Sequence, residues 1–264
     1  MLRRMARIPA LPPPPLLAAD NALFLDVDGT LAPFAPTPGE VTIAPAVLQD
    51  LALLHQRLNG ALALLSGRPM EQLDRLFSPL ALTAGALHGH HWRHAGHQGQ
   101  GNLPPEASRR WLHRHARRLA RLLPGLEVES KHDGLALHWR NAPALGAEVN
   151  RCIACHKVQI AARLPGYRLQ PGDHVLEFVP QGSDKGTALR HLMSLPPFTG
   201  RRPVHIGDDL TDEHAFAAAN ALGGSSVLVG NRTPSLARHQ LPSPSHLHAW
   251  LHRVARTPFE GVTP

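Results

Sequence analysis

Short apolar runs that end in turn residues recur along the chain. The first covers residues 22–25 (ALFL) and is followed by two acids and a glycine, and the second covers residues 61–65 (ALALL) and is followed by Ser-Gly-Arg. Between them, residues 44–60 have apolar positions at helical spacing and end in Asn-Gly, a helix stop signal. Runs that are apolar on both faces are typical of parallel sheets. The pattern predicts a β-α-β unit whose two strands end at the same edge of a sheet.

The middle of the chain has a different pattern, in which the strands alternate apolar and polar residues. The expected elements are a helix over 106–123, strands over 126–130 and 135–139, a helix over 143–163, and strands over 167–171 and 174–179. Gly172-Asp173 is expected to join the last two strands as a hairpin. Alternation of this kind predicts an antiparallel sheet with helices on one face. We expect this α-β-β-α-β-β block to be a cap domain inserted into the first unit.

From residue 184 the first pattern returns. The expected elements are helices over 184–194, 211–219 and 246–256, and strands over 203–209 and 226–230. The expected fold class is therefore α/β, a Rossmann-like parallel-sheet core with an inserted α+β cap. The predicted parts are a flexible Pro-rich leader (1–20), a core formed by 21–103 together with 179–264, and the cap (104–178).

The composition fits a globular enzyme rather than a membrane protein or a disulfide scaffold. The 264 residues are 43% hydrophobic with a mean hydropathy of −0.17, and no apolar run approaches the roughly 18 residues that a membrane span needs. Prolines interrupt the leader before any stretch of signal-peptide length. We therefore expect a cytoplasmic protein without a membrane partner. The net charge of +7 and the pI of about 10.6 favour an anionic partner.

The basic residues concentrate in residues 108–123. Two series of positions four residues apart carry them: Arg110, Arg114 and Arg118, and Arg109, His113, Arg117 and Arg121. Leu112, Leu119 and Leu123 form an apolar stripe, so the segment is expected to be an amphipathic helix. Its cationic face is either a phosphate-binding surface or an ordinary solvated face. Aromatic residues that could stack on bases are not interleaved with the arginines, so nucleic acid is not the expected partner.

Cys152 and Cys155 match the short C-x-x-C-H pattern of haem attachment. The surrounding residues have helical apolar spacing, and a zinc site would need two more ligands. We therefore expect both thiols to face the core as small residues, with no haem or zinc.

The acids after the first strand indicate chemistry. Asp26 and Asp28 point to the same side because side chains along a strand alternate, and carboxylates this close repel each other unless a cation lies between them. Gly29 permits an unusual turn, and Thr30 offers a hydroxyl and an amide to an oxyanion. Ordinary turn chemistry also explains Asp-Val-Asp-Gly when it is taken alone.

A third strand end strengthens the first interpretation. Asp208 and Asp209 follow an apolar run directly, at the end of the strand expected over 203–209, and Asp212 comes one helical turn later. Helix capping explains some of these acids but not Asp208. Together with Ser66 and Lys185, which opens a helix, the strand ends predict an oxygen-rich Mg²⁺ and phosphate site at the carboxyl edge of the sheet.

These motifs resemble those of the haloacid dehalogenase superfamily, in Asp-x-Asp-Gly-Thr, Ser66, Lys185 and Gly-Asp-Asp-x-x-Asp. The segments at 84–89, 128–140, 177–189 and 207–216 resemble more specifically the trehalose-6-phosphate phosphatase family, and the match runs from about residue 21 to 252. The resemblance implies an Mg²⁺-dependent phosphatase that hydrolyses trehalose 6-phosphate to trehalose and phosphate. It also implies a functional link to a trehalose-6-phosphate synthase.

By this resemblance, Asp26 is the nucleophile that forms an aspartyl phosphate, and Asp28 is the general acid and base. The implied metal ligands are Asp26, the Asp28 backbone carbonyl and Asp208, with Asp209 and Asp212 as supports behind them. The implied phosphate-binding residues are Thr30, Ser66 and Lys185.

The resemblance places polar cap residues on the sugar, and the matching positions are Glu129, Lys131, Arg140 and Glu177. The chain departs from the family's usual sequence at Glu177-Phe178-Val179-Pro180 and at His90-His91. Two alternatives stay open: a phosphatase of another sugar or polyol phosphate on the same fold, and a non-catalytic binder of anions or nucleic acid that uses the basic helix.

Overall fold

The computed structural model describes residues 11–35, 38–131, 133–172 and 174–259. The chain forms two compact units: the core unit, residues 1–98 with 184–264, and the cap unit, residues 99–183. The cap unit extends beyond the expected 104–178 on both sides. At its C-terminal end the reason is that the last cap strand continues to Pro180 and the Gln181 amide donates to the Gly166 carbonyl at 2.7 Å.

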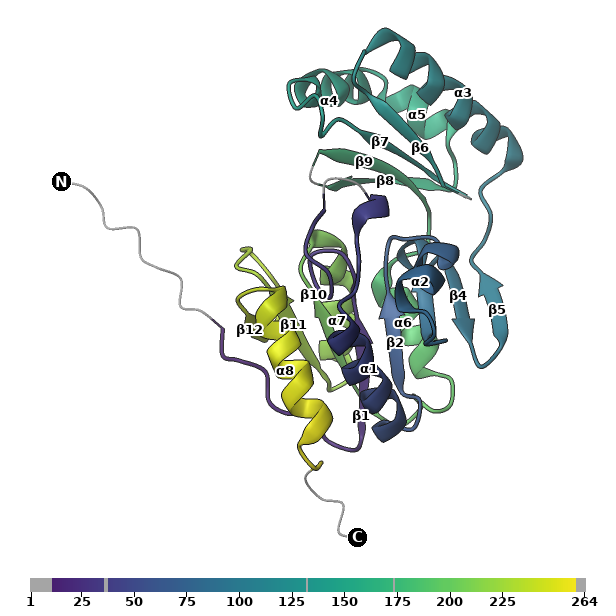
Figure 1. Cartoon of the computed structure of the whole chain (residues 1–264). Helices are drawn as coiled ribbons and strands as arrows, with labels where there is room; N and C mark the ends of the chain where they lie inside the picture. The colour runs from purple at the N-terminus through teal and green to yellow at the C-terminus, as the bar shows by residue number, and fades with distance from the viewer. Residues whose placement is uncertain (1–10, 36–37, 132, 173, 260–264) are drawn as a thin grey trace, which may run out of the picture. The chain divides into compact units, whose positions relative to one another are not determined.

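The core unit is built on an eight-stranded sheet (Figure 1). Every neighbouring pair from β12 to β3 is parallel, and β4 pairs antiparallel with β3. In spatial order the strands are β12 (His239–Leu241), β11 (Ser225–Val229), β10 (Arg202–Gly207), β1 (Asn21–Leu25), β2 (Leu62–Leu65), β3 (Thr83–Ala86), β4 (His91–His94) and β5 (His97–Gln100).

Two pairs of core helices cover opposite faces of this sheet (Figure 1). Helix α1 (Pro45–Arg57) packs against α8 (Pro244–Arg256), and α6 (Lys185–Met193) packs against α7 (Glu213–Ala221). The remaining core elements are α2 (Met70–Phe77) and the 3₁₀ turns η1 (Pro38–Glu40), η2 (Leu87–Gly89) and η3 (Leu210–Asp212).

Strand β1 lies between β10 and β2, and all five of its residues are buried. This explains its continuously apolar sequence, because helices cover both faces of the sheet. The parallel alignment brings the carboxyl ends of β1, β2 and β10 to one edge, as the sequence predicted.

The expected flexible leader needs correction. Residues 11–18 have no regular structure but pack on the core unit: the Leu11 amide donates to Gln240 Oε1 at 3.2 Å, and Leu17 is 5% exposed. Buried leucine and proline side chains make this stretch part of the core, although its prolines exclude a helix or an inner strand. Residues 1–10 lie outside the described residues.

The cap unit is a four-stranded antiparallel sheet covered on one face by three helices (Figure 1). Its elements are α3 (Glu106–Leu122), β6 (Glu127–Ser130), β7 (Leu135–His138), α4 (Leu145–Cys155), α5 (Lys157–Arg163), β8 (Tyr167–Gly172) and β9 (Val175–Pro180). The sheet order is β6-β7-β9-β8. Leu112, Leu135, Leu137 and Phe178 belong to one buried cluster, so the cap has its own hydrophobic core. The expected hairpin turn residue Asp173 lies outside the described residues.

Two differences from the sequence-based prediction concern local structure. The single helix expected over 143–163 is two helices that meet at His156, whose ring contacts the Cys152 carbonyl at 2.8 Å. Such local side-chain bonds compete with regular helix geometry. Strands β3, β4, β5 and β12 were not predicted. None of the helices in the described part of the chain is long and apolar enough to span a lipid bilayer.

The prediction that both thiols face the core is wrong. Cys155 is exposed and Cys152 is half-buried, and neither forms a disulfide. Val149 is the fully buried residue of α4. At about 100° per residue, Cys155 lies roughly 240° around the helix from Val149 and so points away from the buried face, while Cys152 lies at its margin.

Candidate active site

The acids after β1 lie at the edge where the parallel strands end. Asp26 is 4% exposed, and its amide donates to the Ile206 carbonyl of β10 at 3.0 Å. The chain then turns at Gly29, which has φ +81°, a left-handed conformation that favours glycine. A Cβ at Gly29 would lie 2.2 Å from Asp208 Oδ2, so glycine also permits the close approach of the two strand ends.

The strand end at β10 contributes two further acids. Asp208 follows Gly207 directly and accepts a hydrogen bond from Thr30 Oγ1 at 3.0 Å. Asp212 is fully buried because Gly207 leaves room for its carboxylate, which a Cβ there would meet at 2.1 Å. Asp209 caps η3, and its own amide donates to Asp212 Oδ2 at 3.2 Å, so Asp209 fixes the turn that carries Asp212.

Lys185 joins the two acidic strand ends. It is the first residue of α6, where Asp184 caps the helix by accepting a bond from the Thr187 amide. The Lys185 ammonium donates to Asp26 Oδ1 at 2.6 Å and to Asp212 Oδ1 at 2.7 Å, and its side chain is 3% exposed. A buried charge in this position is held by its partners, because an unpaired one would be strongly unfavourable.

The electrostatics of this group are uneven. Burial raises the pKa of Asp26 to about 7, against the attraction of Lys185, and burial with the neighbouring Asp26 raises the pKa of Asp208 to about 9. Burial also opposes ionisation of Asp212, but Lys185 and His205 outweigh it and hold the pKa of Asp212 below its ordinary value. The carboxylates of Asp212 and Asp26 raise the pKa of Lys185, although burial alone would lower it. One lysine therefore does not neutralise all three acids.

This charge imbalance fits a divalent cation. Carboxylate oxygens of Asp26, Asp208 and Asp212 lie within 4.8 Å of one another. Mg²⁺ prefers oxygen ligands of this kind. Because Lys185 and His205 already occupy Asp212 Oδ1, Asp26 and Asp208 are the better candidates for direct ligands.

Asp28 does not join this group through its side chain. Its carboxylate instead forms a two-pronged ion pair with Arg68, in which Nε donates to Oδ2 and Nη2 donates to Oδ1, both at 2.7 Å. Arg68 Nη1 also donates to Gln72 at 2.9 Å. A bidentate pair fixes both the position and the plane of a carboxylate. Arg68 was not predicted as a site residue, although it belongs to the Ser66-Gly67-Arg68 sequence that ends the second strand.

Ser66 and Thr30 lie where the sequence predicted. Ser66 follows β2, the neighbour of β1, and its Oγ accepts a hydrogen bond from the Arg68 amide at 3.2 Å. Thr30 is fully buried and its hydroxyl is used by Asp208. Both hydroxyls lie in the same strand-end region as Asp26. Residues that bind the phosphate must lie near the nucleophile, and these two positions meet that requirement.

His205 is a second residue that sequence reasoning missed. It lies inside β10, is fully buried, and its Nε2 is 2.8 Å from Asp212 Oδ1. Burial lowers the pKa of His205, so the ring is neutral and Nε2–H donates to the carboxylate. A histidine in the middle of an apolar strand is the signal that could have identified it.

In the cap unit, two of the predicted sugar-binding residues lie on strands, Glu129 on the edge strand β6 and Glu177 on β9, and Lys131 follows β6 directly. Glu129 of β6 pairs in register with Ala136 of β7, which pairs with Glu177 of β9, which pairs with Gln170 of β8. Residues in register across a sheet share a face. Since Leu135 and Leu137 alternate with Ala136 and pack under the cap helices, this row lies on the face that the cap's own helices leave uncovered.

Lys131 and Glu177 form an ion pair on this face, and Gln170 Nε2 donates to the second Glu177 oxygen at 3.2 Å. Glu129 Oε2 lies 2.9 Å from His138 Nε2, and this bond lowers the pKa of Glu129. Arg140 differs from the others because it lies in the turn after β7 and is exposed. The structure thus gathers Glu129, Lys131 and Glu177 on one surface and places Arg140 beyond the strand.

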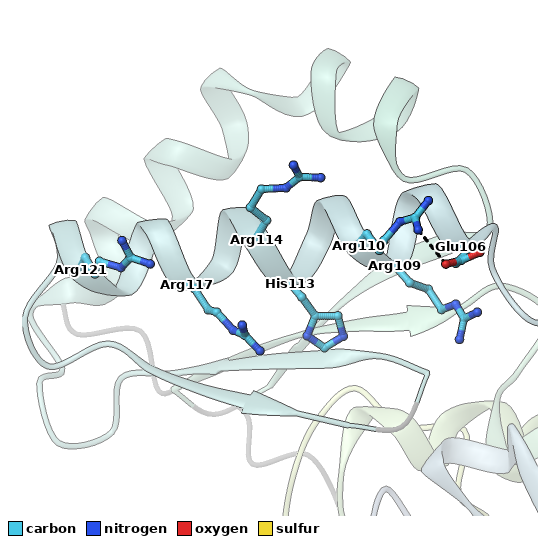
Figure 2. A pocket seen from close by; sticks show the side chains of 7 residues that line it. All are labelled: Glu106, Arg109, Arg110, His113, Arg114, Arg117 and Arg121. Carbon is cyan, nitrogen blue, oxygen red and sulfur yellow. Dashed lines mark hydrogen bonds and ion pairs between the residues drawn. The ribbon is translucent and has the colours of Figure 1, made fainter.

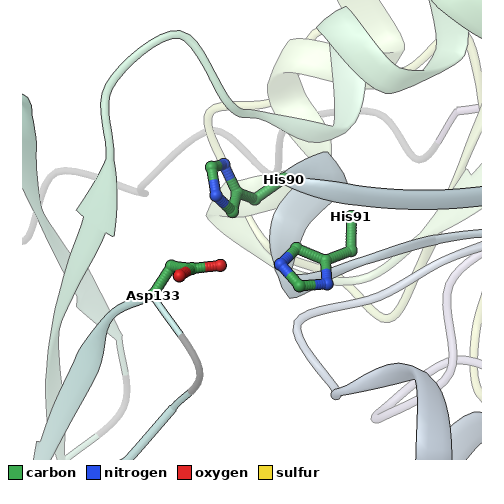
Figure 3. A group of neighbouring side chains, drawn as sticks. All are labelled: His90, His91 and Asp133. Atoms are coloured by element: carbon green, nitrogen blue, oxygen red, sulfur yellow. The ribbon is translucent and has the colours of Figure 1, made fainter. Parts of the chain in front are cut away.

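His90 and His91, where the sequence departs from the family pattern, are neighbours at the start of β4, with ring centroids 5.3 Å apart (Figure 3). His90 is fully buried, so this departure lies in the packing of the core unit. Asp133, which Figure 3 also draws, belongs to the cap unit.

Comparisons with known proteins agree with this geometry. A family model described as trehalose-phosphatase matches residues 24–245. The trehalose-6-phosphate phosphatase of Escherichia coli (strain K12) is 37% identical over 240 residues, which are 91% of this chain and 88% of that protein. A probable trehalose-phosphate phosphatase of Sinorhizobium fredii is 35% identical over 241 residues, which are 89% and 88% of the two chains.

Solved structures share the fold. The C-terminal domain of the C. albicans trehalose-6-phosphate phosphatase superposes with a TM-score of 0.79 at 21% identity and covers 90% of this chain and 92% of its own. A haloacid dehalogenase-like hydrolase from Bacteroides thetaiotaomicron gives a TM-score of 0.64 at 16% identity, with 88% and 98% coverage. The predicted α/β core with an inserted α+β cap is thereby confirmed.

Proposed function

The chain belongs to the trehalose-phosphatase family, whose members are phosphoric monoester hydrolases, and we propose that it hydrolyses trehalose 6-phosphate with Mg²⁺ and Asp26 as the nucleophile. The observation that carries the proposal is the buried ammonium of Lys185, held between Asp26 and Asp212 beside Asp208. This arrangement supports transfer of a phosphoryl group because it combines a nucleophile with positive charge in a buried setting.

In the first step, a carboxylate oxygen of Asp26 attacks phosphorus as the bond from phosphorus to the sugar oxygen breaks. Asp28 gives its proton to the departing sugar oxygen, so that trehalose leaves as the alcohol and the phosphoryl group stays on Asp26. In the second step, Asp28 takes a proton from water, which attacks phosphorus and releases inorganic phosphate and Asp26. In the structure Arg68 occupies both Asp28 oxygens, so one of these contacts has to open before that oxygen can carry the proton, and the other contact then keeps Asp28 oriented.

Two groups balance charge during these steps. Lys185 donates hydrogen bonds at the nucleophile and places positive charge where the phosphoryl oxygens arrive. A bound Mg²⁺, held by Asp26, the Asp28 carbonyl and Asp208, supplies further positive charge that keeps Asp26 ionised. Ser66 is the proposed hydroxyl donor to the phosphate, and Thr30 stays a predicted phosphate-binding residue whose hydroxyl donates to Asp208 in the structure. Asp209 and Asp212 support the turn behind the metal ligands.

The proposed sugar-recognition surface is the cap face that carries Glu129, Lys131 and Glu177, with Arg140 at its margin. Charged side chains that already hold each other in place lose little conformational freedom when they bind hydroxyl groups. The cytoplasmic location and the link to a trehalose-6-phosphate synthase stay predictions.

The chemistry is tested by phosphate release. Asp26→Asn should abolish turnover, while Asp74→Asn, which changes an exposed acid of α2, should retain it. Activity should disappear with EDTA and return with Mg²⁺. Substantial turnover by Asp26→Asn, or full activity in chelator, would refute the proposed site.

The substrate is tested with a panel of sugar and polyol phosphates. Lys131→Ala should lower kcat/KM on trehalose 6-phosphate steeply, because lost hydrogen bonds to a substrate discriminate strongly. Hydrolysis of p-nitrophenyl phosphate, which lacks the sugar, should change little. Preference of the unchanged enzyme for another member of the panel would replace trehalose 6-phosphate as the substrate and leave the chemistry intact.

A further inference from the structure

Helix α3 carries a hollow lined by charged residues that the proposed reaction does not use. The cavity has a volume of about 720 Å³, and its lining residues are Glu106, Arg109, Arg110, His113, Arg114, Arg117 and Arg121. Figure 2 shows Arg109, His113 and Arg117 on one side of the helix and Arg114 on the other. From Arg110 to Arg121 the row extends about 16 Å along the helix axis.

Acidic groups satisfy only one end of this row. Glu106 accepts a bond from Arg110 at 2.9 Å, and Arg109 Nη1 lies 3.9 Å from Asp133 Oδ1. Within the part of the chain that the structure describes, Arg114, Arg117 and Arg121 have no hydrogen-bond or ion-pair partner.

The row is unfavourable without a ligand. Like charges one helical turn apart repel each other, and the row repeats this spacing. Burial lowers the pKa of His113, and repulsion from Arg117 and Arg109 acts in the same direction. An anion that spans the row would relieve this repulsion.

The lining identifies the class of anion. It contains no aliphatic side chain and no Phe, Tyr or Trp, and its one ring is that of His113. Protein interfaces instead have apolar centres, and single-stranded nucleic acids stack on several aromatic rings. Trp111 stacks on His115 at 3.8 Å, and neither residue lines the cavity. Guanidinium groups match phosphate oxygens in geometry and charge. A row of them suits several phosphates joined in a line better than one sugar phosphate.

We propose that this face of α3 is a binding site for a linear polyphosphate chain, which lies along the helix between the two sides of the arginine row. The site is separate from the phosphatase chemistry and does not depend on the proposed substrate.

The test measures binding of a medium-chain inorganic polyphosphate to the full chain by titration calorimetry at about 0.15 M salt, where weak surface attraction is largely screened. The site variant combines Arg114→Gln, Arg117→Gln and Arg121→Gln. The matched control combines Arg151→Gln, Arg163→Gln and Arg190→Gln, which removes the same charge from exposed arginines outside α3. Glutamine keeps the helix propensity of these positions high.

The site variant should bind at least about tenfold more weakly, a loss of about 1.4 kcal/mol, and the control should stay within about twofold. Equal weakening of both variants would show that net charge alone attracts the ligand and would overturn the proposal. Absence of binding by the unchanged protein would overturn it as well. So would equal or tighter binding of duplex DNA or poly-glutamate at the same concentration of charge.

Circular dichroism and thermal unfolding establish that both triple variants are folded. If the site variant does not fold, hydrogen exchange on the unchanged protein decides the question. Polyphosphate should slow exchange in residues 106–122 more than in the other cap helices. Unchanged exchange in that segment would contradict the proposal.

Discussion

Each unit of the chain has a lysine paired with glutamate or aspartate, but the two lysines differ in their surroundings. Lys185 of the core is enclosed between two carboxylates from different strand ends, and it is 2% exposed. Lys131 of the cap pairs with Glu177 on a sheet face that the cap helices leave uncovered. The first pair is enclosed as a fixed part of the fold, while the side chains of the second keep a small exposed fraction, 13% for Lys131 and 12% for Glu177. Phosphoryl transfer needs fixed charge, and sugar recognition needs an accessible surface.

The strongest test of this comparison removes each lysine in turn. Lys185→Met should lower the free energy of unfolding of the metal-free protein by about 3–5 kcal/mol and abolish turnover, because it leaves two buried acids without a cation. Lys131→Met should lower it by no more than about 1–2 kcal/mol. Urea denaturation in EDTA measures both changes. Equal losses would mean that the cap pair is as structural as the core pair.

The pH dependence of stability gives the next largest difference. In the folded state Asp26 keeps its proton up to a pKa of about 7, and Asp208 keeps its proton up to a pKa of about 9. In the unfolded chain both acids have already lost the proton above their ordinary pKa of 3.8. The folded state therefore binds more protons, and the metal-free protein should lose about 2 kcal/mol of stability as pH rises from 7 to 9.

Other groups do not obscure this window. The stabilisation from Lys185, whose pKa is raised, is fully present below pH 10.5, and the lowered pKa of His205 affects stability below about 6.5. Glu129 of the cap has a lowered pKa, so its contribution is present above 4.5 and is lost only as pH falls. Denaturation at several pH values with and without Mg²⁺ measures the slope. A slope that Mg²⁺ leaves unchanged would contradict the assignment of these acids to a metal site.

A smaller effect should follow when Asp28 loses its fixed orientation. Arg68→Gln removes the bidentate pair, so kcat should fall by about 10- to 100-fold with little change in KM, because proton transfer depends on the position of Asp28. The pH profile of kcat should shift as well. Arg75→Gln, an exposed arginine of α2, is the control. A change confined to KM would indicate that Arg68 binds substrate instead.

The smallest expected effect concerns His205. His205→Phe fills the same space but removes the donor to Asp212, so stability should fall by about 1–2 kcal/mol and kcat by a few-fold. His205→Gln, which can restore an N–H donor, should recover part of kcat. Thermal unfolding and steady-state kinetics separate the two quantities. If the glutamine variant is no better than phenylalanine, the hydrogen bond contributes nothing beyond packing.

The core motifs were predictable because the buried parallel strands β1, β2 and β10 are strongly apolar and, apart from His205 inside β10, carry polar residues only at their ends. Strand β3 (TAGA) escaped prediction because its residues are small, and Gly85 faces Leu65 and Ala188 at close range. Strands β4 and β5 are polar, and β12 has only three residues, so none of the three strands gives an apolar run.

The predicted acids and Lys185 were found together because strand order alone brings strand ends to one edge. The partners Arg68 and His205 could not be predicted in the same way. Their roles depend on the direction of one side chain within a turn or a strand, which apolar spacing does not specify.

The insertion of the cap between residues 98 and 184 also determines when the core can form during synthesis. Strand β1 is translated well before its neighbour β10, which begins at Arg202, and Lys185 is 159 residues from its partner Asp26. Such distant pairings form slowly and leave apolar strand edges exposed in the meantime. The cap is complete in sequence before β10 is translated, so the nascent chain holds a folded insert while β1 awaits its partner. We therefore expect the N-terminal core segment to need chaperones during synthesis, until β10 has been translated.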